Sequence, residues 1–341
     1  MISASANRDD QLARLLQCAQ QFGFNWSTAA LVLAAERRGI PYEQLSQSNP
    51  NLIRLGSGRD AKYVNGTLTS ETRVAAIRLA ADKSATNRIL KERGFPVPNQ
   101  LVVRTAQEAV CAAAGIGYPV VVKPLNSNHG NGASVELTEQ EQVQRGFARA
   151  REYSDLVIVE EHVPGCDYRM LVINDRLVAA ARRIPAHVIS DGIHTIRELV
   201  ERVDGDPRRS PGHGNYLTSI AIDGQAEDVL TQQGWTPDSV PAGGDIVQIY
   251  RTANLAKGAT AIDCTSSVHP ENVDMAIRAV QLIGLDVAGV DFITPDIAKP
   301  ARDVGGAICE INASPGLRTH LASEGARQDV AGPIIDMLFP R

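Results

Sequence analysis

Four short apolar runs, each holding a charged side chain, restrict the fold of this chain more than any other feature. The runs are YPVVVKP, LVIVEEH, AGVDFI and AICEIN, and their β-branched residues are typical of buried strands. A charged group in a buried strand is costly unless it meets an opposite charge or a ligand. We therefore expect the chain to fold so that these strands surround a polar site.

Helix signals alternate with these strands, which is the pattern of an α/β or α+β fold. Asp82 precedes one predicted helix, and the segment RMLVINDRLVAAARRIP predicts a hairpin that turns at Asn174 and Asp175. Residues 186–250 are polar and glycine-rich, so we expect a loop-rich insertion that is either a functional lid or partly disordered. Capping boxes predict three further helix starts, at Thr105–Glu108, Thr138–Glu141 and Thr195–Glu198.

The composition excludes several classes of protein. The chain has 341 residues, of which 43% are hydrophobic and 21% charged, as in a soluble globular protein of two or three domains. A net charge of -5 and 4% aromatic residues exclude a generally basic nucleic-acid surface and a stacking platform for single strands. No apolar run approaches the roughly 18–20 residues of a membrane span. Five cysteines without a C-x-x-C spacing predict reduced thiols. We expect a cytoplasmic protein without nucleic-acid or membrane partners.

Two lysines and a glycine-rich loop predict a phosphate site. Lys123 ends a buried apolar strand, where a cation needs an anionic partner. The loop that follows holds Gly130 and Gly132 among polar residues, and such a loop exposes backbone N–H groups to phosphate oxygens. Lys83, at a helix start, can add a second cation. The alternatives are an ordinary turn between strands and, for Lys83, a solvated surface lysine.

A second segment, VIVEEHVPGCDYR, has the features of a nucleoside site. A strand ends in paired carboxylates, a Pro-Gly turn follows, and Asp167 comes next. Backbone groups there can meet a planar base, and the carboxylate can meet a ribose diol. Taken alone, the segment favours a surface hairpin.

Carboxylates and an amide in two apolar strands predict a metal site. Glu310 and Asn312 are two residues apart, so their side chains share one face of a strand. Asp291, on a neighbouring strand, would complete a set of oxygen donors. Such a set suits Mg²⁺, which also keeps waters and substrate phosphates as ligands.

The chain resembles the ATP-grasp superfamily of carboxylate–amine ligases, and within it the ATP-grasp region of cyanophycin synthetases. The segments that carry the resemblance lie between residue 50 and the C-terminus and include DKSATNRILKERGFPVP, GYPVVVKPLNSNHGNGAS, VEEHVPGCDYR, RTANLAKGATAIDCT and CEINASPGLRTHLASEG. The resemblance implies an ATP-grasp fold of mixed α+β or α/β class, with two lobes that clasp ATP. It implies an N-terminal pre-grasp α/β segment at 1–82, a lid subdomain at 83–165 and a C-terminal subdomain at 166–341 that contains the insertion.

The resemblance also implies roles for individual residues. Those implied to bind ATP are Lys83, Lys123, Asn128, Gly130, Gly132, Ser134, Glu160, Glu161, Val163 and Asp167. Those implied to hold Mg²⁺, as two ions, are Asp291, Glu310 and Asn312. Arg169, Arg251 and His129 are the implied catalytic residues. The implied acceptor side consists of Asn254, Gly316, Arg318 and His320. For His129 and His320 a structural role is an equal alternative to that of a general base.

The implied activity is ATP-dependent amide formation between small amino acids or short peptides through an acyl phosphate, inside a lid that excludes water. Arginines near the predicted site, such as Arg169, Arg183 and Arg208, favour an acidic donor, although Arg208 also fits a solvated loop. Relatives of this class often form dimers or tetramers, so a homo-oligomer is one expected state. The alternatives are an ATP-binding regulatory module without turnover and a phosphotransferase variant of the fold.

Two departures from related enzymes narrow the expectation. Cyanophycin synthetases carry a Mur-ligase-like domain that this sequence does not contain, so their second ligation is not expected here. D-alanine–D-alanine ligases usually have an arginine two residues before the metal aspartate, where this chain has Gly289. A D-alanine ligase activity is therefore disfavoured.

Overall fold

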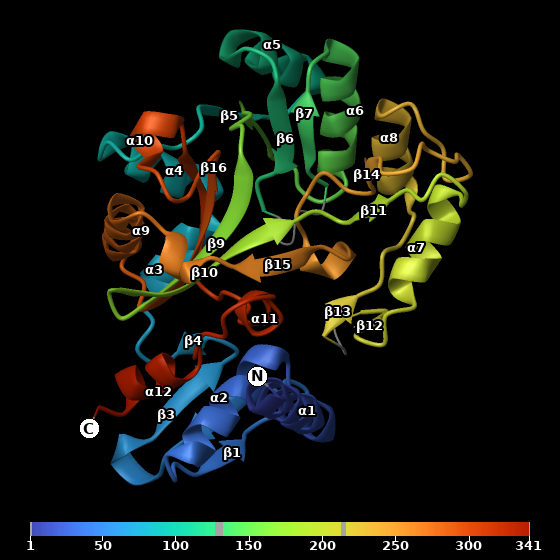
Figure 1. The fold of residues 1–341 in the computed structure, drawn as a ribbon. Helices are drawn as coiled ribbons and strands as arrows, with labels where there is room; N and C mark the ends of the chain where they lie inside the picture. Colours follow the sequence, from blue (N-terminus) through green and yellow to red (C-terminus); the bar gives the residue numbers. More distant parts are fainter. Residues whose placement is uncertain (1, 127–131, 213–215, 341) are drawn as a thin grey trace.

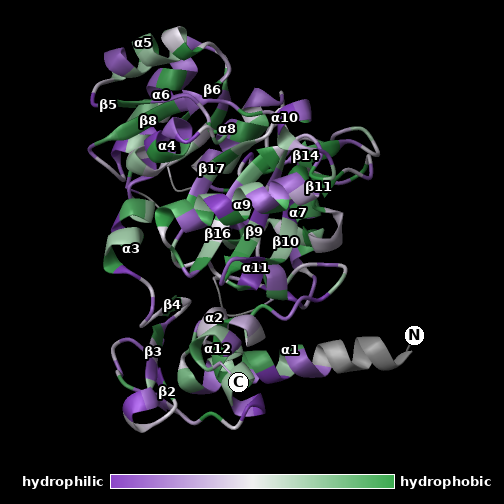
Figure 2. Cartoon of the chain, turned by 90° about the vertical axis from the view of Figure 1, so that its left-hand side faces the viewer, coloured by the Kyte–Doolittle hydropathy of each residue, from purple (hydrophilic) through white to green (hydrophobic). Residues whose placement is uncertain are grey.

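The computed structural model describes residues 2–126, 132–212 and 216–340, and its elements stack in three layers (Figures 1 and 2). The first layer holds the N-terminal helices and a small antiparallel sheet of order β1-β2-β3-β4. Its elements are α1 (Ile2–Phe22), α2 (Trp26–Arg37), β1 (Tyr42–Gln44), β2 (Leu52–Leu55), η1 (Gly58–Asp60), β3 (Lys62–Asn65) and β4 (Leu68–Thr69).

The first layer shares its core with the other end of the chain. Helix α12 (Gly332–Leu338) packs on α2, and Ile335 joins Leu31 and Ile53 in one buried cluster. Leu171 of the central sheet belongs to the same cluster. The predicted division at residue 82 stays a prediction, but the core of this layer draws on residues far beyond it.

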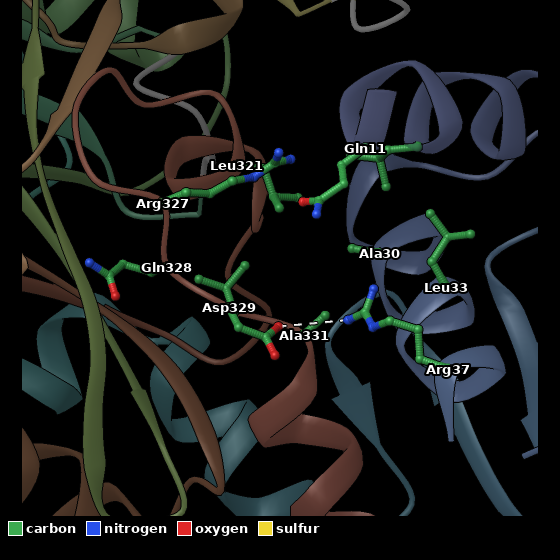
Figure 3. Close-up of a pocket in the computed structure, with 11 residues that line it drawn as sticks. Gln11, Ala30, Leu33, Arg37, Leu321, Arg327, Gln328, Asp329 and Ala331 are labelled. Atoms are coloured by element: carbon green, nitrogen blue, oxygen red, sulfur yellow. Dashed lines mark ion pairs between the residues drawn. The ribbon is translucent and has the colours of Figure 1, made fainter. Parts of the chain in front are cut away.

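A cavity of about 460 Å³ lies between the N-terminal helices and residues 327–331 (Figure 3). Figure 3 shows the Arg37 guanidinium directed at the Asp329 carboxylate across this cavity, at 4.0 Å. Gln11, Leu33 and Leu321 are among its other lining residues. None of the predicted substrate- or nucleotide-binding residues that the structure describes lines it.

The upper layer in Figure 1 is a four-stranded antiparallel sheet of order β5-β8-β6-β7, covered by two helices. Helices α3 (Val74–Ala81) and α4 (Lys83–Glu92) lead into it, and Asp82 caps α4 as predicted. Its elements are β5 (Gln100–Val103), α5 (Ala106–Ile116), β6 (Val120–Pro124), β7 (Ser134–Leu137), α6 (Gln140–Arg151) and β8 (Val157–Glu161).

The central layer is a five-stranded antiparallel sheet of order β15-β10-β9-β16-β17. The predicted hairpin is confirmed: β9 and β10 turn at Asn174 (φ 46°) and Asp175 (φ 61°), residue types that tolerate the left-handed conformation. Helix α9 (Pro270–Ile283) packs on one face of the sheet. The strands are β9 (Cys166–Ile173), β10 (Arg176–Ile184), β15 (Thr260–Asp263), β16 (Val287–Thr294) and β17 (Ala307–Asn312).

Alternation along β9 separates its two faces. Tyr168, Met170 and Val172 are buried against α9 and its neighbours. The opposite face carries Asp167 and Arg169 first and then, two residues further on, apolar side chains that pack on the first layer. One face of this sheet is therefore a polar site at one end and apolar core at the other.

The insertion at 186–250 builds a core of its own. Val188, Ile196, Leu230 and Tyr250 are fully buried in one cluster, so most of this segment is packed structure rather than open loop. Its elements are β11 (His187–Ile189), α7 (Ile196–Asp204), β12 (Arg209–Ser210), β13 (Leu217–Thr218), α8 (Gly224–Gln232) and β14 (Ile246–Gln248). The remaining elements of the chain are η2 (Leu255–Lys257), η3 (Thr265–Ser267), α10 (Ala301–Val304) and α11 (Arg318–Leu321).

One of the three predicted capping boxes is wrong. Thr195 and Glu198 form the full reciprocal box, and Thr105 caps α5. Helix α6, however, begins one residue later than the motif predicts, with Glu139 at the N-cap and no side-chain cap. The Gln142 carboxamide instead accepts from the Thr138 backbone N–H at 2.8 Å, which occupies the amide that the box requires. In the described part of the chain, no helix combines the length and apolarity needed to cross a bilayer.

Candidate active site

The charged end of the central sheet gathers residues that are far apart in the sequence. In the strand register, Asp291 of β16 lies opposite Arg169 of β9 on one side and opposite Glu310 of β17 on the other. Arg183 of β10 lies opposite Asp167 of β9. Residues directly opposite in a sheet share a face, so all five side chains project on the same side.

Two arginines and two aspartates of this group form one partly buried network. Arg169 donates to both carboxylate oxygens of Asp291, at 2.5 Å from Nε and 3.2 Å from Nη2. Arg183 Nη2 lies 2.5 Å from Asp167 Oδ1 and 3.3 Å from Asp291 Oδ1. Burial alone would raise the pKa of Asp291, but Arg169 and Arg183 outweigh it and lower that pKa. Burial raises the pKa of Asp167 despite Arg183.

Gly289 makes room for this network. A Cβ atom at residue 289 would lie 3.0 Å from Arg169 Nη1 and 2.9 Å from Pro315 Cβ, closer than side chains normally pack. The missing side chain thus lets Arg169 cross the strand to Asp291.

The two predicted lysines meet carboxylates at the edge of the network. Lys123 Nζ donates to Glu160 Oε1 at 2.6 Å, and burial would lower the pKa of Lys123, but Glu160 raises it. Lys83 Nζ lies 3.9 Å from Glu310 Oε1. Burial lowers the pKa of Lys83, partly offset by Glu310, and burial raises that of Glu310. Both lysines thus lie in a low-dielectric site, each beside a carboxylate. A polyphosphate that binds there can replace these carboxylates as the anionic partner of each lysine.

The predicted magnesium ligands lie together. Asn312 Nδ2 is 3.4 Å from Asp291 Oδ2, and Glu310 is the cross-strand neighbour of Asp291. Two carboxylates and an amide are hard oxygen donors, so the set fits Mg²⁺ that also takes phosphate oxygens. Within the described ranges, no group of three or more His, Cys, Asp or Glu residues is arranged to hold a metal ion.

The predicted nucleotide-binding residues divide into several environments. Glu160 is buried at 5% exposure, whereas Glu161 faces outward and accepts from Asn99 Nδ2 at 2.8 Å. Val163 is half-buried beyond the end of β8, and Asp167, predicted to bind ribose, lies in the arginine network.

The predicted phosphate loop is only partly described. Asn128, His129 and Gly130 lie outside the described residues. Gly132 has φ +73°, and a Cβ there would approach Tyr153 Cδ2 to 2.7 Å, so this position requires glycine. Ser134 opens β7 and accepts from Arg149 Nη1 at 3.3 Å.

Of the predicted acceptor-side residues, Arg318 is partly buried and His320 is buried. Arg318 donates to Tyr216 O and Thr218 Oγ1 and stacks over the Trp26 ring, and burial lowers its pKa to about 10. His320 is 3% exposed, and neither ring nitrogen has a hydrogen-bond partner among the residues that the structure describes. Burial and the charges of Arg169 and Arg183 lower the pKa of His320 to about 3, which keeps the imidazole neutral.

The other two predicted acceptor-side residues lie near turns. Asn254 caps the short helix η2 by accepting from the Ala256 N–H at 2.8 Å, and the space beside Gly316 is open. Arg251 is held away from the arginine network in an ion pair with Glu136 of β7. Arg208 pairs with Asp206 on the surface, as the solvated alternative requires.

Sequence reasoning missed two residues that shape this site, Trp26 and Glu136, and named a third, Arg183, without its partner. Arg183 was one arginine among several, and only the register of β9 and β10 shows that it meets Asp167. Trp26 and Glu136 carried no signal, because their partners Arg318 and Arg251 lie far away in the sequence.

The fold and the site define an ATP-grasp protein. The family description "RimK-like ATP-grasp domain" matches residues 80–188 and 239–338, and the gap between the two parts falls inside the insertion. The chain belongs to the RimK-like ATP-grasp family. The resemblance found in the sequence and the expected fold class are confirmed.

Curated relatives and a solved structure agree with this membership. Cyanophycin synthetase from Trichormus variabilis is 44% identical over 316 residues, which cover 92% of this chain and 35% of that protein. A glutathione biosynthesis bifunctional protein from Mannheimia succiniciproducens is 33% identical over 324 residues, covering 92% and 42%. The crystal structure of a bifunctional glutathione synthetase from Pasteurella multocida has a TM-score of 0.66 at 29% identity, covering 93% and 43%. The chain thus spans well under half the length of these relatives.

Proposed function

We propose that this chain is an ATP-dependent carboxylate–amine ligase that forms an amide bond through an acyl phosphate. The observation that carries the proposal is the gathering of Lys83, Lys123, Arg169 and Arg183 around a set of buried and partly buried carboxylates at one end of the central sheet. Cations and hard oxygen donors in a low-dielectric site stabilise the charge of a phosphoryl group in transfer. Relatives whose names describe synthetases support amide formation as the outcome.

The residues divide the work by chemistry. Lys83 and Lys123 exchange their carboxylate partners for ATP phosphates. Asp291, Glu310 and Asn312 would hold Mg²⁺, which supplies charge neutralisation on the phosphates. A substrate carboxylate oxygen attacks the γ-phosphorus, ADP leaves, and Arg169 and Arg183 hold the acyl phosphate. The amine then attacks the acyl carbon, phosphate leaves, and a closed lid excludes water from the intermediate.

The substrates are small amino acids or short peptides, with an acidic donor. Arg169 and Arg183, which pair with Asp291 and Asp167 here, carry guanidinium groups whose paired N–H donors also suit a carboxylate or a phosphorylated carboxylate. His320, neutral and buried near them, offers a hydrogen bond to the amine side of the reaction. A homo-oligomer and a cytoplasmic location stay predictions.

Mass spectrometry after incubation with ATP, Mg²⁺ and pooled amino acids tests this proposal, with phosphate release followed in parallel. We expect a product whose mass is that of two pool members less one water, formed together with ADP. Phosphate release without such a product would mean that a donor is activated but its acceptor is missing, whereas ADP without free phosphate would favour the phosphotransferase variant. ATP binding without either signal would favour a regulatory module. Glu310→Ala should abolish turnover, and an unchanged rate would contradict the metal assignment.

A further inference from the structure

The cavity of about 460 Å³ between the N-terminal helices and residues 327–331 lies outside the candidate active site (Figure 3). Its volume is within the range of ordinary small-molecule sites, about 300–1,000 Å³. None of the five charged side chains that meet at the end of the central sheet lines it. A ligand in this cavity would therefore bind apart from the proposed reaction centre.

One part of the cavity wall is apolar. Leu15 of α1, Leu33 of α2 and Leu321 of α11 line it. Leu15 is 3% exposed, whereas Leu33 and Leu321 are only partly buried and pack at the margin of the core of the first layer. Apolar side chains that stay accessible inside a cavity favour a ligand with an apolar part.

Opposite charges face each other across the same cavity. Arg37 Nη2 lies 4.0 Å from Asp329 Oδ1, and the two side chains are 60% and 64% exposed. An exposed pair at this separation contributes little to stability, so the charged groups of a ligand can replace it at modest cost. The Gly332 backbone N–H donates to Asp329 Oδ1 at 2.9 Å, which fixes the carboxylate while Arg37 keeps its freedom to turn.

Other polar side chains of the wall divide into two groups. Figure 3 shows the ends of the Gln11 and Arg327 side chains directed at the same part of the cavity. Gln328 points away from it and donates to Asp263 Oδ2 of β15 at 3.4 Å. The cavity thus presents guanidinium N–H donors for an anion, one carboxylate for a cation, and apolar surface beside both.

We propose that this cavity is a binding site for a free α-amino acid with an apolar side chain. The ligand carboxylate would pair with Arg37, its ammonium group would pair with Asp329, and the three leucines would contact its side chain. Both charged groups of an α-amino acid are bonded to one carbon, so their close spacing matches the 4.0 Å between Arg37 and Asp329. The charged ends of a dipeptide lie further apart. The inference does not depend on the proposed ligase reaction.

Isothermal titration calorimetry of the full chain with L-leucine tests the proposal without ATP. We expect saturable binding of one L-leucine per chain. L-leucinamide and N-acetyl-L-leucine each lack one of the two charges and should bind about 10-fold more weakly or less, because each loses a charge-assisted contact. Equal binding of the three compounds, or no saturable binding of L-leucine, would overturn the site. Tighter binding of L-leucyl-L-leucine than of L-leucine would contradict the spacing argument.

A pair of arginine variants locates the binding. Arg37→Gln should weaken L-leucine binding by about 10-fold or more, since the guanidinium that meets the carboxylate is lost. Arg14→Gln is the matched control: Arg14 of α1 pairs with Glu36 of α2 at 3.4 Å, is 69% exposed and does not line the cavity. We expect it to bind L-leucine as the wild type does, and thermal unfolding should show both variants folded. Equal losses in the two variants would overturn the assignment to this cavity.

Glu310→Ala separates the cavity from the candidate active site. Glu310 does not line the cavity, so this variant should bind L-leucine with unchanged affinity even though it loses a proposed metal ligand. Lost binding in Glu310→Ala together with unchanged binding in Arg37→Gln would place the amino acid in the active site and overturn the proposal. A failed ligase assay would count against the proposed function only, because the titration needs no turnover.

Discussion

The two ends of one face of the central sheet differ in what covers them. At one end Asp167 and Arg169 of β9 face Arg183, Asp291 and Glu310. At the other end the same alternation presents Leu171 and Ile173, which pack against α2, α12 and Leu317. Both pairs of residues lie on the same face of the same strand. The difference between the two ends therefore comes from the residue types in β9 and from the elements that pack on each end.

One end of β9 thus contributes mainly to stability, and the other end carries residues of the candidate site. The apolar end is sealed by both termini of the chain and gains stability from burial. The charged end has partly compensated charges, a buried His320 without hydrogen-bond partners among the described residues, and lysines held beside acids. Burying ionic groups in this way contributes little to stability and readies them for an anionic ligand.

The largest effect should come from Asp291→Asn at the charged end. Removing this carboxylate takes the ion-pair partner from Arg169, leaves Arg183 with Asp167 alone, and deletes a proposed metal ligand. We expect kcat to fall by about 100-fold or more, and the free energy of unfolding to fall by roughly 3–5 kcal/mol. Product formation and chemical denaturation measure both. Asp303→Asn, on the exposed helix α10, is the control and should change neither.

Leu171→Ala should lower the stability of the protein without lowering kcat, because it changes only the apolar end. Leu171 is fully buried two residues from Arg169, and its truncation should cost about 2–5 kcal/mol of unfolding free energy. Because the side chain packs away from the charged network, we expect kcat per folded molecule to stay within about twofold. A large loss of kcat in the folded variant would show that the two ends are not independent.

Gly289→Ala should disturb the charged end through steric contact, because it adds a methyl group and changes no charge. The added methyl group would collide with Arg169 and Pro315, which should cost about 1–3 kcal/mol and lower turnover through the displaced arginine. Gly115→Ala in α5 is a matched control, because its new methyl group meets open space and should be neutral or stabilise by up to about 1 kcal/mol. Equal behaviour of the two variants would contradict the role assigned to Gly289.

The smallest effect should come from an exposed ion pair. Arg88 and Glu92 lie one turn apart on α4 and are 67% and 60% exposed. Glu92→Ala should lower the free energy of unfolding by no more than about 0.5 kcal/mol, and 1 M salt should abolish the difference. A loss as large as that of Asp291→Asn would contradict the distinction between buried and exposed charges.

Much of the fold could be predicted because local rules decide it. The alternation in AICEIN places Glu310 and Asn312 on one face, and Asp82 caps α4, as the sequence indicates. The start of α6 could not be predicted, because the Gln142 side chain competes for the amide that the capping box requires.

The connections of the candidate site depend on contacts that no local pattern records. Arg169 and Asp291 are 122 residues apart, and only the register of β9 and β16 brings them together. Arg318 stacks on Trp26 from the other end of the chain. Glu136 gives no sign in the sequence that its backbone is left-handed or that it holds Arg251. The residue types of the candidate site are thus predictable, whereas the partners that position them are not.

Oxygen transfer from donor to phosphate tests most directly whether the charged end activates a carboxylate. Amino acids labelled with ¹⁸O in their carboxyl groups are incubated with ATP, Mg²⁺ and the protein, and the released phosphate is analysed by mass spectrometry. Acyl phosphate formation moves one carboxylate oxygen into phosphate, so we predict ¹⁸O-labelled phosphate in amounts equal to the amide formed. Unlabelled phosphate released together with amide would contradict carboxylate activation by this site.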